Sequence, residues 1–167
     1  ESVEQRLRRL ESLREIEECV LHYTRCADLA DAVGMAACFS ADGLLYWTPD
    51  GEPAASGRDN ILRHFEKLAG RARAQEHLCT NFQILFRSAE SAVGECNMFS
   101  WQMWKDASRP NTVCFGKYEF KAVLEDGQWR LASLRMILNA KIESGDIADG
   151  RIAEHIGRPW PPEGIGE

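Results

Sequence analysis

The chain has 167 residues, is 44% hydrophobic and carries a net charge of −6, with an isoelectric point near 5.3. This length suits one domain whose core is large enough to enclose a cavity. The acidic balance argues against a nucleic acid as partner, because phosphates attract basic patches. No apolar run approaches the roughly 20 residues that a membrane helix needs.

The six cysteines stand singly within apolar patterns and form no Cys-x-x-Cys pair. They are Cys19, Cys26, Cys38, Cys79, Cys96 and Cys114. No basic-then-apolar leader opens the chain. We therefore expect reduced, buried thiols and a cytoplasmic location.

Residues 2–27 are predicted to form one long amphipathic helix, because apolar residues recur at steps of three and four along them. Ser2, followed three residues later by Gln5, predicts a capping box at its start. The apolar stripe consists of Val3, Leu7, Leu10, Leu13, Ile16, Val20 and Tyr23.

The segment that follows is predicted to form two more helices and a short strand. A small-residue helix is expected over 31–39, and Ala41-Asp42-Gly43 is a turn signal. A strand is predicted over 44–48, and a third helix over 58–69 ends at Gly70.

From residue 76 the pattern changes to four long strands joined by short turns, which predicts an antiparallel meander. The predicted strands are 76–86, 92–104, 112–125 and 128–142. The expected fold class is α+β: a cone-shaped α+β barrel, in which the N-terminal helices pack inside a curved, mainly antiparallel sheet. This domain covers residues 1–142, and residues 143–167 form a C-terminal arm in which Trp160 is a candidate anchor.

Tyr23, Asp28 and His77 form a candidate acid/base site. Tyr23 lies on the helix face that points into the core, where a phenol needs a partner. Asp28 follows at the helix end, and a carboxylate there can hold one ring nitrogen of a histidine and leave the other free as a base. His77, at the start of the strand pattern, is our choice for that histidine.

The pocket wall is predicted from strand parity. Cys79 and Asn81 share the face of His77 by the two-residue period, until a bulge intervenes. Trp47, Phe99 and Trp101 are the candidate aromatic lining residues, although the face of the second long strand cannot be assigned from its mixed alternation.

Arg135 lies in the middle of an apolar strand, where a cation needs an anion or a route to solvent. It is a candidate clamp for a substrate oxygen. The alternative is an arginine that points outward into solvent.

The chain resembles the SnoaL-like branch of the nuclear transport factor two-like superfamily. The resemblance is carried by Tyr23-x-x-x-x-Asp28, by the Phe39-Ser-Ala-Asp-Gly segment and by His77-x-x-Thr-Asn81, and the order of elements matches over residues 8–142. Within this branch the pattern is most similar to bile acid 7α-dehydratase, hexachlorocyclohexane dehydrochlorinase and scytalone dehydratase. The resemblance implies that Asp28 and His77 act as a catalytic dyad. Other members keep the fold without catalysis.

The resulting hypothesis is a cofactor-independent, dehydratase-type lyase for a small, mostly apolar cyclic or aromatic substrate. His77 is the general base, and Tyr23 donates to the departing hydroxyl or holds a carbonyl oxygen. The scattered histidines predict no metal site. One alternative is an isomerase or polyketide cyclase with the same site. Another is a non-catalytic ligand-binding protein or an assembly subunit like the β subunits of ring-hydroxylating dioxygenases. We expect a homodimer or homotrimer built through the exposed sheet face.

Overall fold

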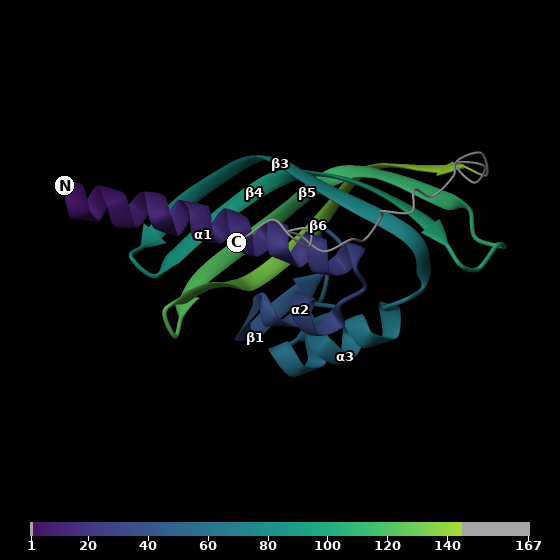
Figure 1. Cartoon of the computed structure of the whole chain (residues 1–167), viewed down its shortest axis with the longest axis horizontal. Helices are drawn as coiled ribbons and strands as arrows, with labels where there is room; N and C mark the ends of the chain where they lie inside the picture. The colour runs from purple at the N-terminus through teal and green to yellow at the C-terminus, as the bar shows by residue number, and fades with distance from the viewer. Residues whose placement is uncertain (1, 145–167) are drawn as a thin grey trace, which may run out of the picture.

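A computed structural model of the chain describes residues 2–144, in which three helices pack on one face of a six-stranded sheet (Figure 1). The first helix, α1 (Val3–Asp28), confirms the predicted helix and extends one residue beyond it. Its start is the expected capping box. The Ser2 hydroxyl accepts from the Gln5 amide at 3.2 Å, and the Gln5 side chain accepts from the Ser2 amide at 2.7 Å.

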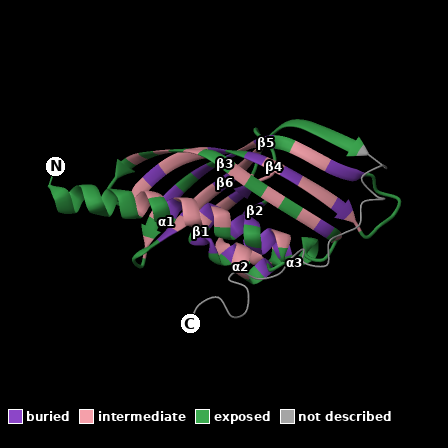
Figure 2. Ribbon diagram, turned by 45° about the horizontal axis from the view of Figure 1, so that its top comes forward, coloured by how far each residue is buried: buried purple, intermediate pink, exposed green. Residues whose placement is uncertain are grey.

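The two halves of α1 differ in burial. Ile16, Val20 and Tyr23 in the second half are buried, with at most 2% of their surface exposed. The first turns project beyond the end of the sheet, so their apolar residues have little to pack against (Figures 1 and 2). Val3, Leu7 and Leu10 are 78%, 54% and 63% exposed, which corrects the expectation of one continuous core-facing stripe.

The segment after α1 differs from its prediction. Helix α2 (Ala32–Ala37) is shorter than expected, and strand β1 (Phe39–Tyr46) begins at Phe39 rather than at Leu44. The residues read as a turn form an irregularity within β1, where the register with the neighbouring strand shifts between Phe39 and Leu44. Gly43 is needed there, because a Cβ at this position would lie 2.9 Å from the Phe39 side chain. Ala41-Asp42-Gly43 therefore forms a bulge within the strand and not a turn that reverses the chain.

The sequence did not predict the short strand β2 (Ala55–Ser56). The other elements follow the predicted order, and helix α3 (Arg58–Leu68) precedes four long strands. These are β3 (Ala72–Ser88), β4 (Ser91–Trp104), β5 (Asn111–Glu125) and β6 (Gln128–Ser144), and β3 begins four residues earlier than predicted.

The sheet has the strand order β2-β1-β6-β5-β4-β3. Strands β3 to β6 form the expected antiparallel meander, and β1 pairs with β6 in parallel. The sheet is therefore mixed but mostly antiparallel, with the helices packed on its inner face. This α+β arrangement confirms the predicted fold class.

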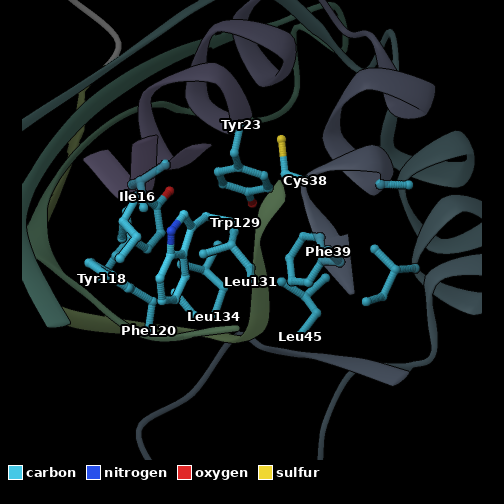
Figure 3. Packing of buried hydrophobic residues seen from close by; sticks show 14 of the residues in the cluster. Ile16, Tyr23, Cys38, Phe39, Leu45, Tyr118, Phe120, Trp129, Leu131 and Leu134 are labelled. Carbon is cyan, nitrogen blue, oxygen red and sulfur yellow. The ribbon is translucent and has the colours of Figure 1, made fainter. Parts of the chain in front are cut away.

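The core lies between this inner face and the helices. Figure 3 shows the Tyr23 ring reaching from α1 into an aromatic cluster with Phe39 and Tyr118. Both partners meet Tyr23 edge-on, with ring centroids 6.0 and 6.1 Å away. Edge-to-face pairs of this kind add stabilisation beyond the area that they bury. Tyr23 is thus held in place by packing on both sides of its ring.

All six cysteines are free thiols, three of them buried and three half-buried. None of the helices within residues 2–144 combines the length and the apolar composition required to cross a lipid bilayer. The predicted C-terminal arm, with Trp160, lies outside the described residues, and β6 continues to Ser144.

Candidate active site

Asp28 and His77 are in direct contact. The His77 ring nitrogen Nδ1 lies 2.7 Å from Asp28 Oδ1, and the His77 backbone amide donates to Asp28 Oδ2 at 3.2 Å. The Asp28 side chain is only 20% exposed and the His77 side chain only 13%. Because a carboxylate accepts, Nδ1 is the nitrogen that donates to Asp28, and Nε2 is the nitrogen left free when the ring is neutral. The arrangement gives a histidine with a fixed tautomer and a free basic nitrogen.

The end of α1 positions this pair. Asp28 is the last helical residue, and Ala30, with a φ of 55°, turns the chain away from the helix axis. Gln75, two residues before His77 on β3, donates to the Ala27 carbonyl. Two residues of one strand therefore bind the last turn of α1.

Tyr23 lines the same cavity as the pair. No hydrogen bond joins its hydroxyl to another residue within 2–144, and the hydroxyl is not among the fully enclosed polar atoms that lack a partner. It is therefore available to a molecule in the cavity. Burial raises the pKa of Tyr23 far above its ordinary value, with smaller contributions from the thiols of Cys38 and Cys79. The phenol stays protonated and acts as a donor throughout the neutral range.

The cavity has a volume of about 370 Å³ and is mainly apolar. This lies within the range of small-molecule sites, which are apolar clefts with a few convergent polar groups. The apolar part of its wall is formed by Ala27, Met35, Trp47, Phe65, Met98 and Met136.

Trp47 lies in the cavity wall and is held by a histidine of α3. Its indole nitrogen donates to His64 Nε2 at 2.8 Å, and the two rings lie 5.9 Å apart. Burial lowers the pKa of His64, as do the charges of Lys67 and Arg71, so the imidazole stays a neutral acceptor. His64 therefore fixes the orientation of Trp47.

Strand β3 changes face shortly after His77. Its register with β4 shifts between Thr80 and Gln83, and Asn81 has a φ of 56°. Cys79, before the shift, points inward but packs against the core and is not part of the cavity wall. Asn81 is exposed at the bulge, so the expectation that it lines the cavity is wrong.

Strand β4 presents its even-numbered residues to the cavity. His77 pairs with Ser100, and Met98, Ser100, Gln102 and Trp104 line the wall. Phe99 and Trp101, expected as lining residues, lie on the outer face. The Phe99 ring packs 5.2 Å from that of Phe115, and the Trp101 indole donates to Glu76 at 3.2 Å. The pairing register decides this, because both sets of side chains contain aromatic residues.

Arg135 also points away from the cavity, so its predicted role as a substrate clamp is wrong. Its Nη1 donates to the carbonyls of Thr48 and Pro49 at 2.9 and 2.6 Å, and its guanidinium lies 3.8 Å from the centroid of the Tyr46 ring. Met136, the next residue, faces the cavity instead. Through these two hydrogen bonds, Arg135 stabilises the loop that follows β1.

Several polar cavity residues were missed by the sequence reasoning. Tyr118 on β5 is a second buried phenol, and burial raises its pKa as well. Thr112 on β5 donates to Gln102 on β4 at 2.7 Å, and Gln102 donates to Ser100 at 3.1 Å. Ser100 and Gln102 are polar residues at alternate positions of a largely buried strand. Periodicity alone would assign such polar positions to the solvent side, so the sequence offered no signal that they face the cavity.

The fold and the site define a class of protein: a cone-like α+β domain whose helices and sheet enclose an apolar cavity with an Asp–His pair in its wall. Residues 8–135 match the SnoaL-like domain family. The chain belongs to this family, as the resemblance indicated. No curated protein matches the chain in sequence.

Solved structures of similar fold include enzymes of the lyase class. A candidate scytalone dehydratase from Novosphingobium aromaticivorans DSM 12444 is 24% identical, with a TM-score of 0.74 over 81% of this chain and 89% of that one. A type 2 hexachlorocyclohexane dehydrochlorinase (LinA) is 18% identical, with a TM-score of 0.74 over 95% and 99%. A type 3 LinA from Novosphingobium barchaimii LL02 is 18% identical, with a TM-score of 0.73 over 83% and 94%. At such identities the likeness establishes the fold alone.

Proposed function

We propose that the protein is a cofactor-independent lyase of the dehydratase type, acting on a small, mostly apolar cyclic or aromatic substrate. The observation that carries the proposal is the Asp28–His77 pair, 2.7 Å apart, in the wall of an apolar cavity that also holds the Tyr23 phenol. A base, its orienting carboxylate and a hydrogen-bond donor are the groups that an elimination next to a carbonyl requires.

The proposed reaction begins with proton abstraction. His77 Nε2 takes the proton from the carbon next to an activating carbonyl, and Asp28 stabilises the imidazolium that forms. Tyr23 donates a hydrogen bond to the oxygen on which negative charge develops. The carbon–oxygen bond to the hydroxyl then breaks as the carbon–carbon double bond forms. The imidazolium returns its proton to the departing hydroxyl, which leaves as water, and the neutral histidine is restored.

The test is mass spectrometry of products after incubation with hydroxylated cyclic ketones, steroid-like thioesters and aromatic polyketides. We expect the wild type to remove water from a member of this panel, and His77→Ala to lose the activity. His22→Ala is the matched control, because His22 neighbours Tyr23 on α1 but is exposed. Unchanged rates in His77→Ala would overturn the proposal. A product of unchanged mass would favour the isomerase alternative.

We also propose that the protein forms a homodimer or homotrimer through the outer face of the sheet. Large apolar side chains from three strands are exposed on this face, and such patches mark association surfaces. They are Leu78, Leu85, Phe115 and Ile142. Light scattering coupled to size-exclusion chromatography would show a monomer for Leu78→Glu and an oligomer for the wild type. A monomeric wild type would contradict this arrangement.

A further inference from the structure

Four cations surround one end of the cavity, and we call them the basic rim: Arg71, Arg73, Lys105 and Arg109. The three arginines lie in the cavity wall. Lys105 follows β4, and its backbone amide donates to the Arg71 carbonyl at 3.1 Å. A Cβ on Gly70 would lie 3.7 Å from the Lys105 ammonium nitrogen, so this charge stands beside the start of β3. The rim lies where α3 leads into β3 (Figure 1).

None of the four cations forms an ion pair within residues 2–144. Arginines elsewhere in this part of the chain do pair with glutamates, for example Arg25 with Glu18 and Arg58 with Glu125. The loop that carries Arg109 also carries Asp106, whose carboxylate accepts hydrogen bonds from the Ser108 amide and hydroxyl at 2.9 and 2.6 Å. One carboxylate therefore offsets only part of the rim's charge. Local positive charge in a chain of net charge −6 focuses an attractive field for anions on this end of the cavity.

Trp104 holds the Arg109 guanidinium of the basic rim in a fixed orientation. The Arg109 guanidinium lies 3.8 Å from the centroid of the Trp104 ring. Stacking of this kind fixes the guanidinium plane and leaves its N–H groups free to donate. The Trp104 indole nitrogen is enclosed in the cavity wall and has no hydrogen-bond partner within residues 2–144. Because this nitrogen is fully enclosed, a molecule in the cavity does not reach it, and the Arg109 guanidinium is the donor that the stacked pair offers.

The distance from the rim to the Asp–His pair follows from the strand pairing. Arg73 lies four residues before His77 on β3, and Trp104 lies four residues beyond Ser100 on β4. At a rise of about 3.3 Å per residue, the two sites are about 13 Å apart along the sheet. A molecule that reaches both is longer than a single ring.

We propose that the substrate is an elongated apolar molecule with an anionic group, a carboxylate or a phosphate ester, that the basic rim binds while the reacting carbon lies at His77. The position of the reacting carbon rests on the proposed function. The binding of the anion does not, because it depends only on the rim.

A matched pair of probes tests the rim directly: 4-biphenylcarboxylate and its neutral analogue 4-biphenylcarboxamide. Binding is followed by isothermal titration calorimetry, at low and at high ionic strength. The carboxylate is expected to bind the wild type about tenfold more tightly than the amide, since hydrogen bonds to charged groups are the strong ones. Salt should reduce this preference, because it screens charges near the surface.

Single substitutions show which residues cause the preference for the carboxylate. Arg73→Gln and Arg109→Gln should each remove most of the preference for the carboxylate. Arg87→Gln should keep it, because Arg87 is an exposed arginine at the opposite end of β3. His77→Ala should also keep it, so the rim can be right even when the lyase proposal fails. Equal binding of the two probes, no binding of the carboxylate, or a preference that survives in both rim variants would overturn the proposal.

Discussion

The two ends of the cavity are built in opposite ways. At one end, Asp28 and His77 are joined by two hydrogen bonds and are mostly buried. At the other end, Arg71, Arg73 and Arg109 have no ion-pair partner within residues 2–144. Under the proposed function, the two ends have different tasks. Groups that move a proton must be held in place before the substrate arrives, whereas groups that attract a charge must remain unpaired until it does.

The largest effect is expected from Asp28→Asn, which keeps the shape of the side chain and removes its charge. The amide no longer stabilises the imidazolium, and its NH2 group can donate to Nδ1, which selects the wrong tautomer. On the substrate found with the wild type, kcat should fall about 10³-fold, near the middle of the range known for acid–base groups. Thermal unfolding by circular dichroism should show that the fold persists. A kcat within threefold of the wild type would mean that the pair is structural.

Tyr23→Phe should lower kcat by about 10- to 100-fold, because it removes a hydrogen bond to a group that becomes charged in the transition state. The melting temperature should stay the same or rise, since the hydroxyl has no partner within residues 2–144 that would be left unsatisfied. Tyr118→Phe on β5 is the matched control for the loss of a buried hydroxyl in the same cavity. A larger loss of kcat in this control would transfer the role to Tyr118.

Alkaline unfolding should reveal the two buried phenols. Their ordinary pKa is 10.0, and burial raises it in the folded state. Below pH 10 both states are protonated and nothing is lost. Above it only the unfolded chain releases the protons, so the free energy of unfolding falls by at most about 1.4 kcal/mol per pH unit for each phenol.

The double variant Tyr23→Phe, Tyr118→Phe should flatten this fall, as measured by urea unfolding between pH 9 and 11. The buried thiols of Cys38 and Cys96 also have a raised pKa, the first through its hydrogen bond with Cys19 and the second through that with Cys79. They contribute equally in wild type and variant, so the difference isolates the phenols. Identical slopes would show that the phenols ionise in the folded state.

Trp104→Phe should separate the two ends of the cavity in steady-state kinetics. It replaces the indole beneath the Arg109 guanidinium with a smaller aromatic ring, which stacks less strongly on the cation. KM should rise about threefold with kcat unchanged, which is the pattern of lost uniform binding. Trp101→Phe, on the outer face of the same strand, should change neither constant. A fall in kcat alone for Trp104→Phe would place this side chain at the reacting end.

The smallest effect is expected from Arg135→Gln. Because Arg135 points away from the cavity and binds the Thr48 and Pro49 carbonyls, kcat and KM should stay within about twofold of the wild type. Loss of the loop contact should lower stability by about 1 kcal/mol, measured by chemical unfolding. A loss of activity without a loss of stability would restore the clamp interpretation.

Sequence periodicity by itself determined most of the architecture. The step of three and four residues identified α1, and the alternation from residue 76 onward identified the four long strands. These are local signals, because each reports which side of one element is apolar. The Asp28–His77 contact joins segments 49 residues apart, and the family resemblance of Tyr23-x-x-x-x-Asp28 and His77-x-x-Thr-Asn81 was what supported this pairing.

The tertiary structure alone decided which face of each strand meets the cavity. Phe99 and Trp101 lie outside because β4 pairs with β3 through His77 and Ser100, and Asn81 lies outside because a bulge reverses the alternation. The exposed start of α1 follows from where the sheet ends (Figure 2). Pairing register and the extent of a neighbouring element are relations between distant segments. A pattern within one segment carries no information about them, which is why the wall of the cavity, unlike its Asp–His pair, required the folded chain.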